Sequence, residues 1–403
     1  MEKEHLPLVE KKLLAKLHSF LLEHLHADIA QLAFKKELVK GLDNRFVLEQ
    51  LYGKQKAKTK LPFLFEQSTI LYPVKVSVEQ STSQLVAQWK SNLVQGEKML
   101  DMTGGFGIDS YHFAQKVQQL TYIEQQTPLF KIVQHNFQQL AVDNIKVHNA
   151  NAVDFLSTTK EQFDWIYLDP ARRDEAGNRK IGLLGYTPNM IEIKDLLLTK
   201  TKNILLKTSP MLDIQQAIQQ LQSVTKIYVV GLQNEVKELL FVLSSQVTPN
   251  IKFHCVNLHK DGTNNTYIPN TSLEEKVSYH LPKTYLYEPN ATILKAGLFR
   301  EVALDFGLHK LHSNTHLYTS DSLYPSFPGR IFTCEAVVPY QAKQLRKHLS
   351  GQQANITTRN FPYIVAQMRK KLKLSEGGDQ YLFGTTLMDE KLKVLVCRKV
   401  GGE

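Results

Sequence analysis

The sequence predicts an α/β fold in residues 77–246, with a seven-stranded, doubly wound parallel sheet. Two observations predict it. Short apolar runs alternate with stretches of helical periodicity along this region. A glycine-rich loop also stands between the first apolar run and the helix that follows it. Parallel strands need crossover connections, which are usually helices, so this alternation favours a sheet with helices on both faces.

The predicted elements follow a regular order. A helix over residues 77–94, which begins with Ser and Thr cap candidates, precedes the first strand. Each of the first five strands is followed by a stretch of helical periodicity, whereas the sixth and seventh strands come in succession. The seven predicted strands are KMLDM, LTYIEQ, IKVHNAN, FDWIYLDP, NILLKTSP, KIYVVGL and KELLFVLSS.

Three further segments flank this region. Residues 1–76 carry apolar residues at three- and four-residue spacing and predict a small N-terminal helical domain. In residues 247–327 the regular alternation of strands and helices is lost, and this segment predicts a small module of mixed elements. Residues 328–403 alternate strands and helices again and predict an α+β domain. A chain of 403 residues is long enough for several domains.

Bulk composition argues against several classes of protein. No apolar run reaches the roughly 20 residues that a membrane-spanning helix needs, and the N-terminal stretch lacks the apolar core of a signal peptide. We therefore expect a cytoplasmic protein with no membrane partner. The three cysteines are far apart and have no metal-binding spacing, so we expect reduced thiols. The 14 histidines form no His-Glu-x-x-His pattern, and we expect no metal site.

The charge balance favours a polyanionic partner, with nucleic acid ahead of membrane. The net charge is +10. Residues 329–399 contain 13 Lys and Arg against five Asp and Glu, an excess of eight positive charges that makes up most of this total. Such an excess is typical of a phosphate-binding surface. Helices with solvated basic faces are the alternative at this point.

A glycine loop follows the first predicted strand. Glycines at this place allow a tight turn and a close approach of the backbone to a ligand. The loop suits a dinucleotide, a phosphate or S-adenosylmethionine; a Walker loop is excluded, because no Gly-Lys-Ser/Thr follows. Ser110 stands where a dinucleotide fingerprint has its third glycine. The loop reads Asp101, Met102, Thr103, Gly104, Gly105, Phe106, Gly107, Ile108 and Asp109.

Polar residues end the next two strands. Glu124 ends the second strand, 19 positions after Gly105, where a carboxylate can accept both ribose hydroxyls of an adenosine. Asn151 follows the third strand, where an amide faces the ligand crevice of a doubly wound sheet. It can contact an adenine edge or cap the helix that begins there, and the sequence does not choose between them.

The fourth strand ends at Asp169-Pro170, followed by Ala171, Arg172 and Arg173. In an open α/β sheet this edge lies beside the reactive end of a bound cofactor. Proline stiffens the turn, because it fixes φ and has no N–H. Arg172 and Arg173 can pair with a substrate phosphate or can be solvated loop residues.

Together, the glycine loop, Glu124 and the run Asp-Pro-Ala-Arg resemble class I S-adenosylmethionine-dependent methyltransferases. The later segments LYEPNATILKAG, FPGRIF, ITTRNFP and LRKHL resemble a bacterial group within them. In that group a small ferredoxin-like segment and a THUMP-like domain follow the methyltransferase. The resemblance implies a Rossmann-like methyltransferase domain in residues 77–246, a ferredoxin-like module in 247–327 and a THUMP-like domain in 328–403. It implies S-adenosylmethionine as cofactor and RNA as partner, because THUMP domains are RNA-binding modules.

The family pattern also implies roles for single residues. Asp169 and Pro170 form the substrate corner, with Arg172 and Arg173 beside it. Thr103 departs from the pattern, since many methyltransferases have their first glycine there, and Asn151 stands where an Asp is commoner. The implied cofactor-binding residues are Asp101, Thr103, Gly104, Gly105, Phe106, Gly107, Glu124 and Asn151.

The sequence favours direct methyl displacement. Enzymes that methylate amino groups of bases typically carry Asp/Asn-Pro-Pro-aromatic, but Ala171 and Arg172 occupy the last two places here. Methylation of pyrimidine carbon 5 needs a cysteine nucleophile, and none is close to the fourth or fifth strand. Asp169 remains as the acceptor or orienting group. An RNA nucleotide is the favoured substrate; a protein or small-molecule substrate with the basic domain as a docking module is the alternative, and a cofactor-binding scaffold is a third hypothesis.

Overall fold

The computed structural model describes residues 11–171, 182–246, 250–270 and 276–401. It divides into two compact units. The first comprises Met1–Ile227 and Glu238–Ile251, and the second comprises Tyr228–Lys237 and Lys252–Glu403. The finer division into four domains that the sequence suggests stays a prediction.

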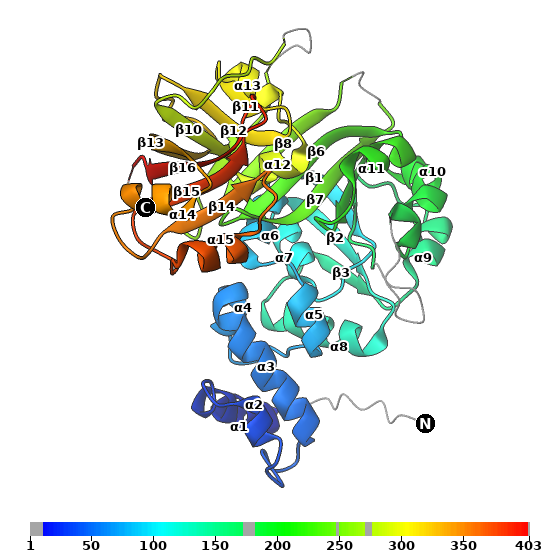
Figure 1. Ribbon diagram of the computed structural model, residues 1–403. Helices are drawn as coiled ribbons and strands as arrows, with labels where there is room; N and C mark the ends of the chain where they lie inside the picture. The colour runs from blue at the N-terminus through cyan, green and yellow to red at the C-terminus, as the bar shows by residue number, and fades with distance from the viewer. Residues whose placement is uncertain (1–10, 172–181, 247–249, 271–275, 402–403) are drawn as a thin grey trace. The chain divides into compact units, whose positions relative to one another are not determined.

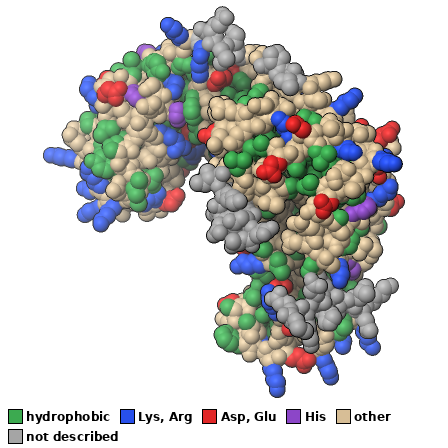
Figure 2. Space-filling model, turned by 90° about the vertical axis from the view of Figure 1, so that its right-hand side faces the viewer, with side chains coloured by type: hydrophobic (Ala, Val, Ile, Leu, Met, Phe, Trp, Pro, Cys, Tyr) green, Lys and Arg blue, Asp and Glu red, His purple; other side chains and the backbone are tan. Residues whose placement is uncertain are grey.

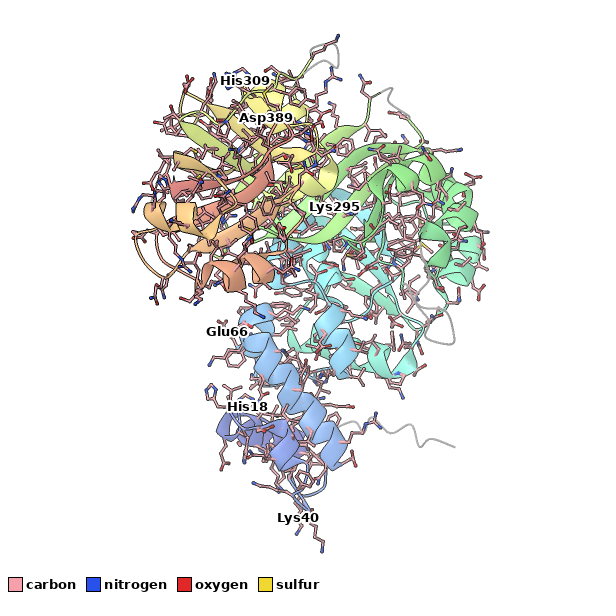
Figure 3. The ribbon with its side chains drawn as sticks, in the orientation of Figure 1. His18, Lys40, Glu66, Lys295, His309 and Asp389 are labelled. Atoms are coloured by element: carbon pink, nitrogen blue, oxygen red, sulfur yellow. The ribbon has the colours of Figure 1, made fainter. Side chains whose placement is uncertain are left out.

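The first unit begins with helices, as the periodicity predicts (Figure 1). Two of them start at aspartates that accept a hydrogen bond from the first turn: Asp28 from the Ala30 amide and Asp43 from the Phe46 amide. Figure 3 labels His18 on α1 and Glu66 at the end of α4. The helices are α1 (Lys11–Glu23), α2 (Ile29–Leu32), α3 (Asn44–Lys60) and α4 (Pro62–Phe65). The apolar faces of α1, α2 and α3 share one buried core with Ile132 of the later helix α8 (Thr127–Gln139).

The single helix predicted over residues 77–94 is wrong, because the structure has two helices there. They are α5 (Lys75–Gln80) and α6 (Gln84–Ser91). The chain leaves the helical conformation at Ser81, with φ −59° and ψ 151°. The break has a consequence for the site: the Thr82 hydroxyl donates a 2.8 Å hydrogen bond to Asp109 Oδ2.

The main sheet contains all seven predicted strands but has nine in total, in the order β3-β2-β1-β4-β5-β7-β6-β8-β9 (Figure 1). The prediction of seven strands is therefore corrected. The last two strands come from a segment assigned by sequence to the next module. They extend the sheet beyond β6, where an exposed edge would otherwise leave backbone groups unpaired. The strands are β1 (Gly96–Asp101), β2 (Val117–Ile123), β3 (Ile145–His148), β4 (Trp165–Leu168), β5 (Asn203–Thr208), β6 (Val224–Leu232), β7 (Glu235–Ser244), β8 (Lys252–Leu258) and β9 (Asn264–Tyr267).

The arrangement of the first five strands positions the candidate site. β1 pairs in parallel with both β2 and β4, and β4 pairs in parallel with β5. The chain thus runs outward on both sides of β1, and ligands of open α/β sheets bind at such a switch point, beyond the carboxyl ends of the strands. β7 is antiparallel to β5. The connecting helices are α7 (Ile108–Ala114), α8, α9 (Ala152–Thr158), α10 (Met190–Lys200) and α11 (Ile214–Leu221).

The second unit holds a separate seven-stranded sheet in the order β11-β12-β10-β13-β16-β15-β14. β10 and β13, which the sequence assigns to two successive modules, pair antiparallel within it. Apolar residues from β13, β14, β15, β16 and α15 form one of its buried cores. From residue 276 onward its elements are β10 (Tyr285–Pro289), α12 (Ala291–Ala296), α13 (Glu301–Asp305), β11 (His309–His312), β12 (Thr315–Ser320), β13 (Gly329–Pro339), α14 (Ala342–Leu345), β14 (Asn355–Arg359), α15 (Val365–Leu372), β15 (Gln380–Thr386) and β16 (Leu392–Lys399).

Candidate active site

Each glycine of the loop after β1 stands where a Cβ would clash or where the backbone conformation disfavours one. A Cβ on Gly104 would lie 2.0 Å from Cε2 of Tyr122. Gly105 and Gly107 have φ of +55° and +76°, a conformation that residues with a Cβ rarely adopt. The Tyr122 hydroxyl donates a 2.7 Å hydrogen bond to the Gly105 carbonyl, and this bond holds the turn in place. The loop therefore presents main chain, not side chains, at this edge of the sheet.

Glu124, just beyond β2, is bonded to this loop. Its Oε2 accepts a 3.1 Å hydrogen bond from the Gly105 amide, and its Oε1 accepts a 2.7 Å bond from the Gln126 amide. The residue is only 8% exposed. Burial raises the pKa of Glu124, while the two backbone donors favour its ionised form. A buried carboxylate thus stands beside the main chain of the loop.

Asp101 organises the loop from the end of β1. It accepts a 3.0 Å hydrogen bond from the Thr103 amide and a 2.5 Å bond from the Ser110 hydroxyl. Ser110, which interrupts a dinucleotide fingerprint, therefore serves as a partner for this buried carboxyl. Burial raises the pKa of Asp101 to about 7, although both hydrogen bonds oppose the shift.

Thr103 joins the glycine loop to the Asp-Pro corner after β4. Its hydroxyl oxygen accepts a 2.5 Å hydrogen bond from the Asp169 amide. A glycine at position 103 could not make this bond. The departure from the common family pattern therefore has a structural role, and it holds the first and fourth strand ends together.

The Asp169 side chain forms an ion pair with Lys207 at the end of β5. Lys207 Nζ lies 2.5 Å from Asp169 Oδ2. The Asp169 side chain is 38% exposed, whereas that of Lys207 is only 11% exposed. Burial lowers the pKa of Lys207, but the charges of Asp169 and Asp109 outweigh this effect and raise it overall. Lys207 is therefore a fixed ammonium group beneath the corner.

A buried ion network continues below this pair; it consists of Lys90, Asp109, Asp169, Lys207 and Glu238. Lys90 Nζ lies 3.1 Å from Asp109 Oδ1 and 3.0 Å from Glu238 Oε2, and its side chain is fully buried. Asp109 Oδ2 lies 4.0 Å from Lys207 Nζ. Burial alone would raise the pKa of Asp109, but the two lysines hold it at about 2. The turn at Asp169 and Pro170 is therefore linked, through Lys207, to a set of paired buried charges.

From the sequence, Asp109 was noted only as the end of the glycine loop, and the network was not predicted. A signal for it exists. Lys207 and Glu238 interrupt the apolar strands NILLKTSP and KELLFVLSS, and charged residues in buried strands are rare unless they are paired. Which partners they have could not be read from the sequence.

Comparison with known proteins decides the family. The chain is 31% identical to a protein from Porphyromonas gingivalis W83 that was assigned as a methyltransferase. The match covers 97% of this chain and 99% of that one, with a TM-score of 0.86. This chain belongs to that methyltransferase family. The predicted methyltransferase assignment is confirmed.

Family models divide the methyltransferase in the order that the sequence suggests. Residues 55–228 match the model described as conserved hypothetical protein 95. Residues 285–328 match a ferredoxin-like domain, and residues 329–399 match a THUMP domain-like model. The succession of methyltransferase, ferredoxin-like and THUMP-like parts is thereby confirmed.

Two other solved structures match a smaller share of the methyltransferase. An rRNA methylase from Streptococcus thermophilus is 11% identical, covers 40% of this chain and 93% of its own, and has a TM-score of 0.30. TrmK from M. capricolum, solved with S-adenosylhomocysteine, is 9% identical, covers 40% of this chain and 68% of its own, and has a TM-score of 0.32. No curated protein matches the chain.

The remaining sequence-predicted residues have mixed outcomes. Asn151 caps α9, since its side chain accepts hydrogen bonds from the Val153 and Asp154 amides at 2.9 and 3.2 Å. The capping alternative is confirmed, and the adenine contact stays a prediction. Pro170 and Phe106 are buried. Arg172 and Arg173 lie outside the described residues.

Among residues 11–171, 182–246, 250–270 and 276–401, no cluster of His, Cys, Asp and Glu is suited to bind a metal ion. Within the same ranges, no helix has the length and apolar character to cross a membrane.

His112 on α7 gives the methyltransferase a pH-dependent stability. The residue is 2% exposed, and neither ring nitrogen has a hydrogen-bond partner among the described residues. Burial lowers the pKa of His112 to about 4, below the unfolded value of 6.5. The unfolded chain therefore binds the proton more readily, and stability is lost as the pH falls from about 6.5 to about 4.

We expect the His112→Phe variant to lose this dependence, because Phe cannot titrate. When the pH is lowered from 8 to 5, the unfolding free energy of the wild type should fall by about 2 kcal/mol more than that of the variant. Urea denaturation at both pH values measures it. Parallel pH curves for the variant and the wild type would contradict the expectation.

Proposed function

We propose that this methyltransferase uses S-adenosylmethionine to modify a nucleotide in RNA, by direct displacement without a covalent cysteine adduct. The observation that carries the proposal is the meeting of three strand ends at one edge of the sheet. The glycine loop, Glu124 and Asp169 are joined there by the hydrogen bonds of Gly105 and Thr103. They come from the two sides of the switch point, where a nucleoside cofactor binds in folds of this kind.

The residues present fit S-adenosylmethionine. A Cβ on Gly105 would meet only the Thr103 carbonyl oxygen, at 3.6 Å, so a ligand can approach the main chain closely there. Glu124 offers buried carboxylate oxygens to ribose hydroxyls, and the Asn151 amide is the candidate contact for adenine. S-adenosylmethionine supplies an electrophilic methyl group on a sulfonium centre. The residues that would hold it are Asp101, Thr103, Gly104, Gly105, Phe106, Gly107, Glu124 and Asn151.

The positions of the cysteines support displacement without a covalent adduct. All three, Cys255, Cys334 and Cys397, lie far from the fourth and fifth strands in the sequence. Cys255 and Cys397 are completely buried. The fifth strand, where a nucleophile would be needed, ends in Lys207 and Thr208. Positioning by Asp169 and Pro170 is then the protein's main contribution.

The basic surface of the THUMP-like part supports RNA as partner. On α15, Met368 and Leu372 are buried while Lys370, Lys371 and Lys373 at the end of the helix are exposed. The ammonium of Lys371 lies 4.1 Å from the centre of the Tyr340 ring. Exposed cations beside aromatic rings suit phosphates and bases. Lys and Arg side chains project from the molecular surface in Figure 2.

A binding titration tests the RNA partner. We expect the Lys370→Glu/Lys371→Glu/Lys373→Glu variant to bind total RNA at least tenfold more weakly than the wild type, and wild-type binding to weaken steeply with added salt. Filter binding at two salt concentrations measures both. The matched control is Lys35→Glu/Lys36→Glu/Lys40→Glu, which changes the charge equally at exposed positions of the first unit. Equal, salt-insensitive affinities would remove RNA from the proposal.

A labelling experiment tests the substrate class. An extract from cells that lack the gene is incubated with the enzyme and methyl-labelled S-adenosylmethionine, and then fractionated. We expect the label in RNA. Label in protein or in small molecules would favour the alternative, in which the basic domain serves for docking.

A further inference from the structure

Two of the three cysteines face each other across the second sheet. Cys334 on β13 stands directly opposite Cys397 on β16, in antiparallel register, although the two residues are far apart in the chain. Figure 1 shows these strands side by side. Both side chains pack on the same apolar core, together with Phe332 and Leu395. Both cysteines are free thiols in the structure.

The pair occupies a non-hydrogen-bonded position of the ladder. The Cys334 amide donates a 2.9 Å hydrogen bond to the Thr284 carbonyl, on the side of β13 that faces β10 and not β16. In an antiparallel pair, residues at such positions have Cα atoms about 4.5 Å apart and hold their side chains closest together. Disulfides span Cα separations of about 4.4–6.8 Å, so the two thiols can join with little movement of the backbone.

A β-bulge lies directly beside the two cysteines. The register shifts between Cys334 and Ala336, so Glu335 has no residue of its own opposite it on β16. Its carboxylate lies 2.6 Å from Nε of Arg398 instead. A bulge interrupts the ladder and increases the local twist. The strands next to the cysteines are therefore less regularly paired and can adjust to a cross-link.

The two thiols have different surroundings. Cys334 is partly exposed, whereas Cys397 is completely buried. A hydrogen bond from the Cys397 thiol lowers the pKa of Cys334, and the same bond raises the pKa of Cys397. The thiolate is the nucleophilic form of cysteine. Cys334 is therefore the thiol that reacts first, and Cys397 is the one that reacts second.

We propose that Cys334 and Cys397 are a redox-active pair, which a peroxide oxidises to a cross-strand disulfide and a thiol reductant restores. Cys334 attacks the peroxide, and Cys397 resolves the product. The disulfide joins β13 and β16, the first and last strands of the part that matches a THUMP domain-like model.

The atoms and electrons balance for hydrogen peroxide. The Cys334 thiolate attacks one peroxide oxygen, the O–O bond breaks, and hydroxide leaves, which gives a sulfenic acid. The Cys397 thiol loses its proton to this hydroxide and attacks the Cys334 sulfur. The S–S bond forms, the S–O bond breaks, and the second hydroxide takes up the proton that Cys334 released when it ionised. Two thiols and one peroxide thus give one disulfide and two water molecules; sulfur is oxidised and the peroxide oxygen is reduced.

Peptide mapping tests the disulfide. The full-length protein is treated with hydrogen peroxide, blocked with N-ethylmaleimide, denatured with the blocker present and digested with trypsin. We expect residues 331–343 and 394–398, which contain Cys334 and Cys397, to form one linked peptide that dithiothreitol separates. Separate peptides, whether alkylated or over-oxidised, or a link between two copies of 331–343, would overturn the proposal.

Cys255 is the internal control for peptide mapping. It is completely buried and stands opposite Tyr267 in the sheet, not opposite a cysteine. We expect its tryptic peptide, residues 253–260, to stay reduced under the same treatment. Oxidation of Cys255 as fast as that of Cys334 would show that the peroxide attacks cysteines without regard to this pairing, and the proposal would be wrong.

Variants at position 397 test the two roles. Cys397→Ser removes the resolving sulfur but keeps a hydroxyl that can donate to Cys334. We expect Cys334 of this variant to accumulate sulfenic acid, which dimedone labels at least about tenfold more than in the wild type. Cys397→Ala removes the donor as well, so iodoacetamide should alkylate its Cys334 at least about threefold more slowly than that of Cys397→Ser at neutral pH.

Two results would contradict these roles. Equal dimedone labelling of the wild type and Cys397→Ser would show that Cys397 resolves nothing. Equal alkylation rates of Cys397→Ser and Cys397→Ala would show that position 397 does not activate Cys334. The peptide map uses the unaltered protein, so it tests the disulfide even if a variant fails to fold.

Discussion

Replacement of Lys90 by methionine should lower the free energy of unfolding by about 3–5 kcal/mol. The Lys90 side chain is fully buried between Asp109 and Glu238. Its Nζ also lies 3.3 Å from the Tyr167 hydroxyl and 3.4 Å from the Thr82 hydroxyl. Methionine fills a similar volume but leaves Glu238 without its counter-ion and leaves Asp109 with only the more distant Lys207, in a buried site. Urea denaturation at pH 7 measures the change.

Two further variants separate charge from packing at Lys90. The double variant Lys90→Met/Glu238→Gln also removes the unpaired carboxylate of Glu238. We expect its free energy of unfolding to be at least about 1 kcal/mol higher than that of Lys90→Met. The matched control is Lys98→Met, at a lysine that is 45% exposed and lies 2.8 Å from Glu161. An exposed pair of this kind contributes about 1 kcal/mol or less. A loss at Lys90 no larger than that at Lys98 would show that the network does not stabilise the fold.

Replacement of Glu124 by alanine should weaken S-adenosylhomocysteine binding about 100-fold. The carboxylate is 8% exposed and already accepts two backbone hydrogen bonds, so its oxygens are held in place before a ligand arrives. Hydrogen bonds to a charged group contribute about 1.5–3 kcal/mol each, and the loss of one to two of them corresponds to about two decades in affinity. Calorimetry on the purified full-length protein measures the affinity.

The control for Glu124 is Glu161→Ala. Glu161 is 38% exposed on the same unit and pairs with Lys98, away from the loop. We expect its affinity for S-adenosylhomocysteine to equal that of the wild type. An affinity of Glu124→Ala within threefold of the wild type would contradict the ribose contact. If the wild type gave binding heat with a nicotinamide cofactor and none with S-adenosylhomocysteine, the cofactor assignment would be wrong.

Much of this architecture could be predicted because its signals are local. All seven predicted strands are present, since each is an apolar run bounded by polar or glycine residues. The glycine loop was also predictable, because a tight turn such as that at Gly105 and Gly107 requires glycine itself. Parallel strands then bring their carboxyl ends to one edge, which is why Asp101, Glu124 and Asp169 could be assigned to a common site.

Other features depended on contacts between distant residues. β8 and β9 extend the main sheet beyond β6, and nothing local in their sequence indicates this partner. Asn151 was equally suited to two roles until the hydrogen bonds from Val153 and Asp154 identified it as a helix cap. Thr103 gained its role only from the nearby amide of Asp169.

By itself, the sequence determined the succession of seven strands along the chain, the glycine turn and the strand ends at which carboxylates stand, because these follow from the chemistry of neighbouring residues. Only the tertiary structure decided that Lys90 meets Glu238, 148 residues away, and that Lys207 holds Asp169. The physical reason is burial: a charge removed from water must be paired with whichever opposite charge the fold brings to it.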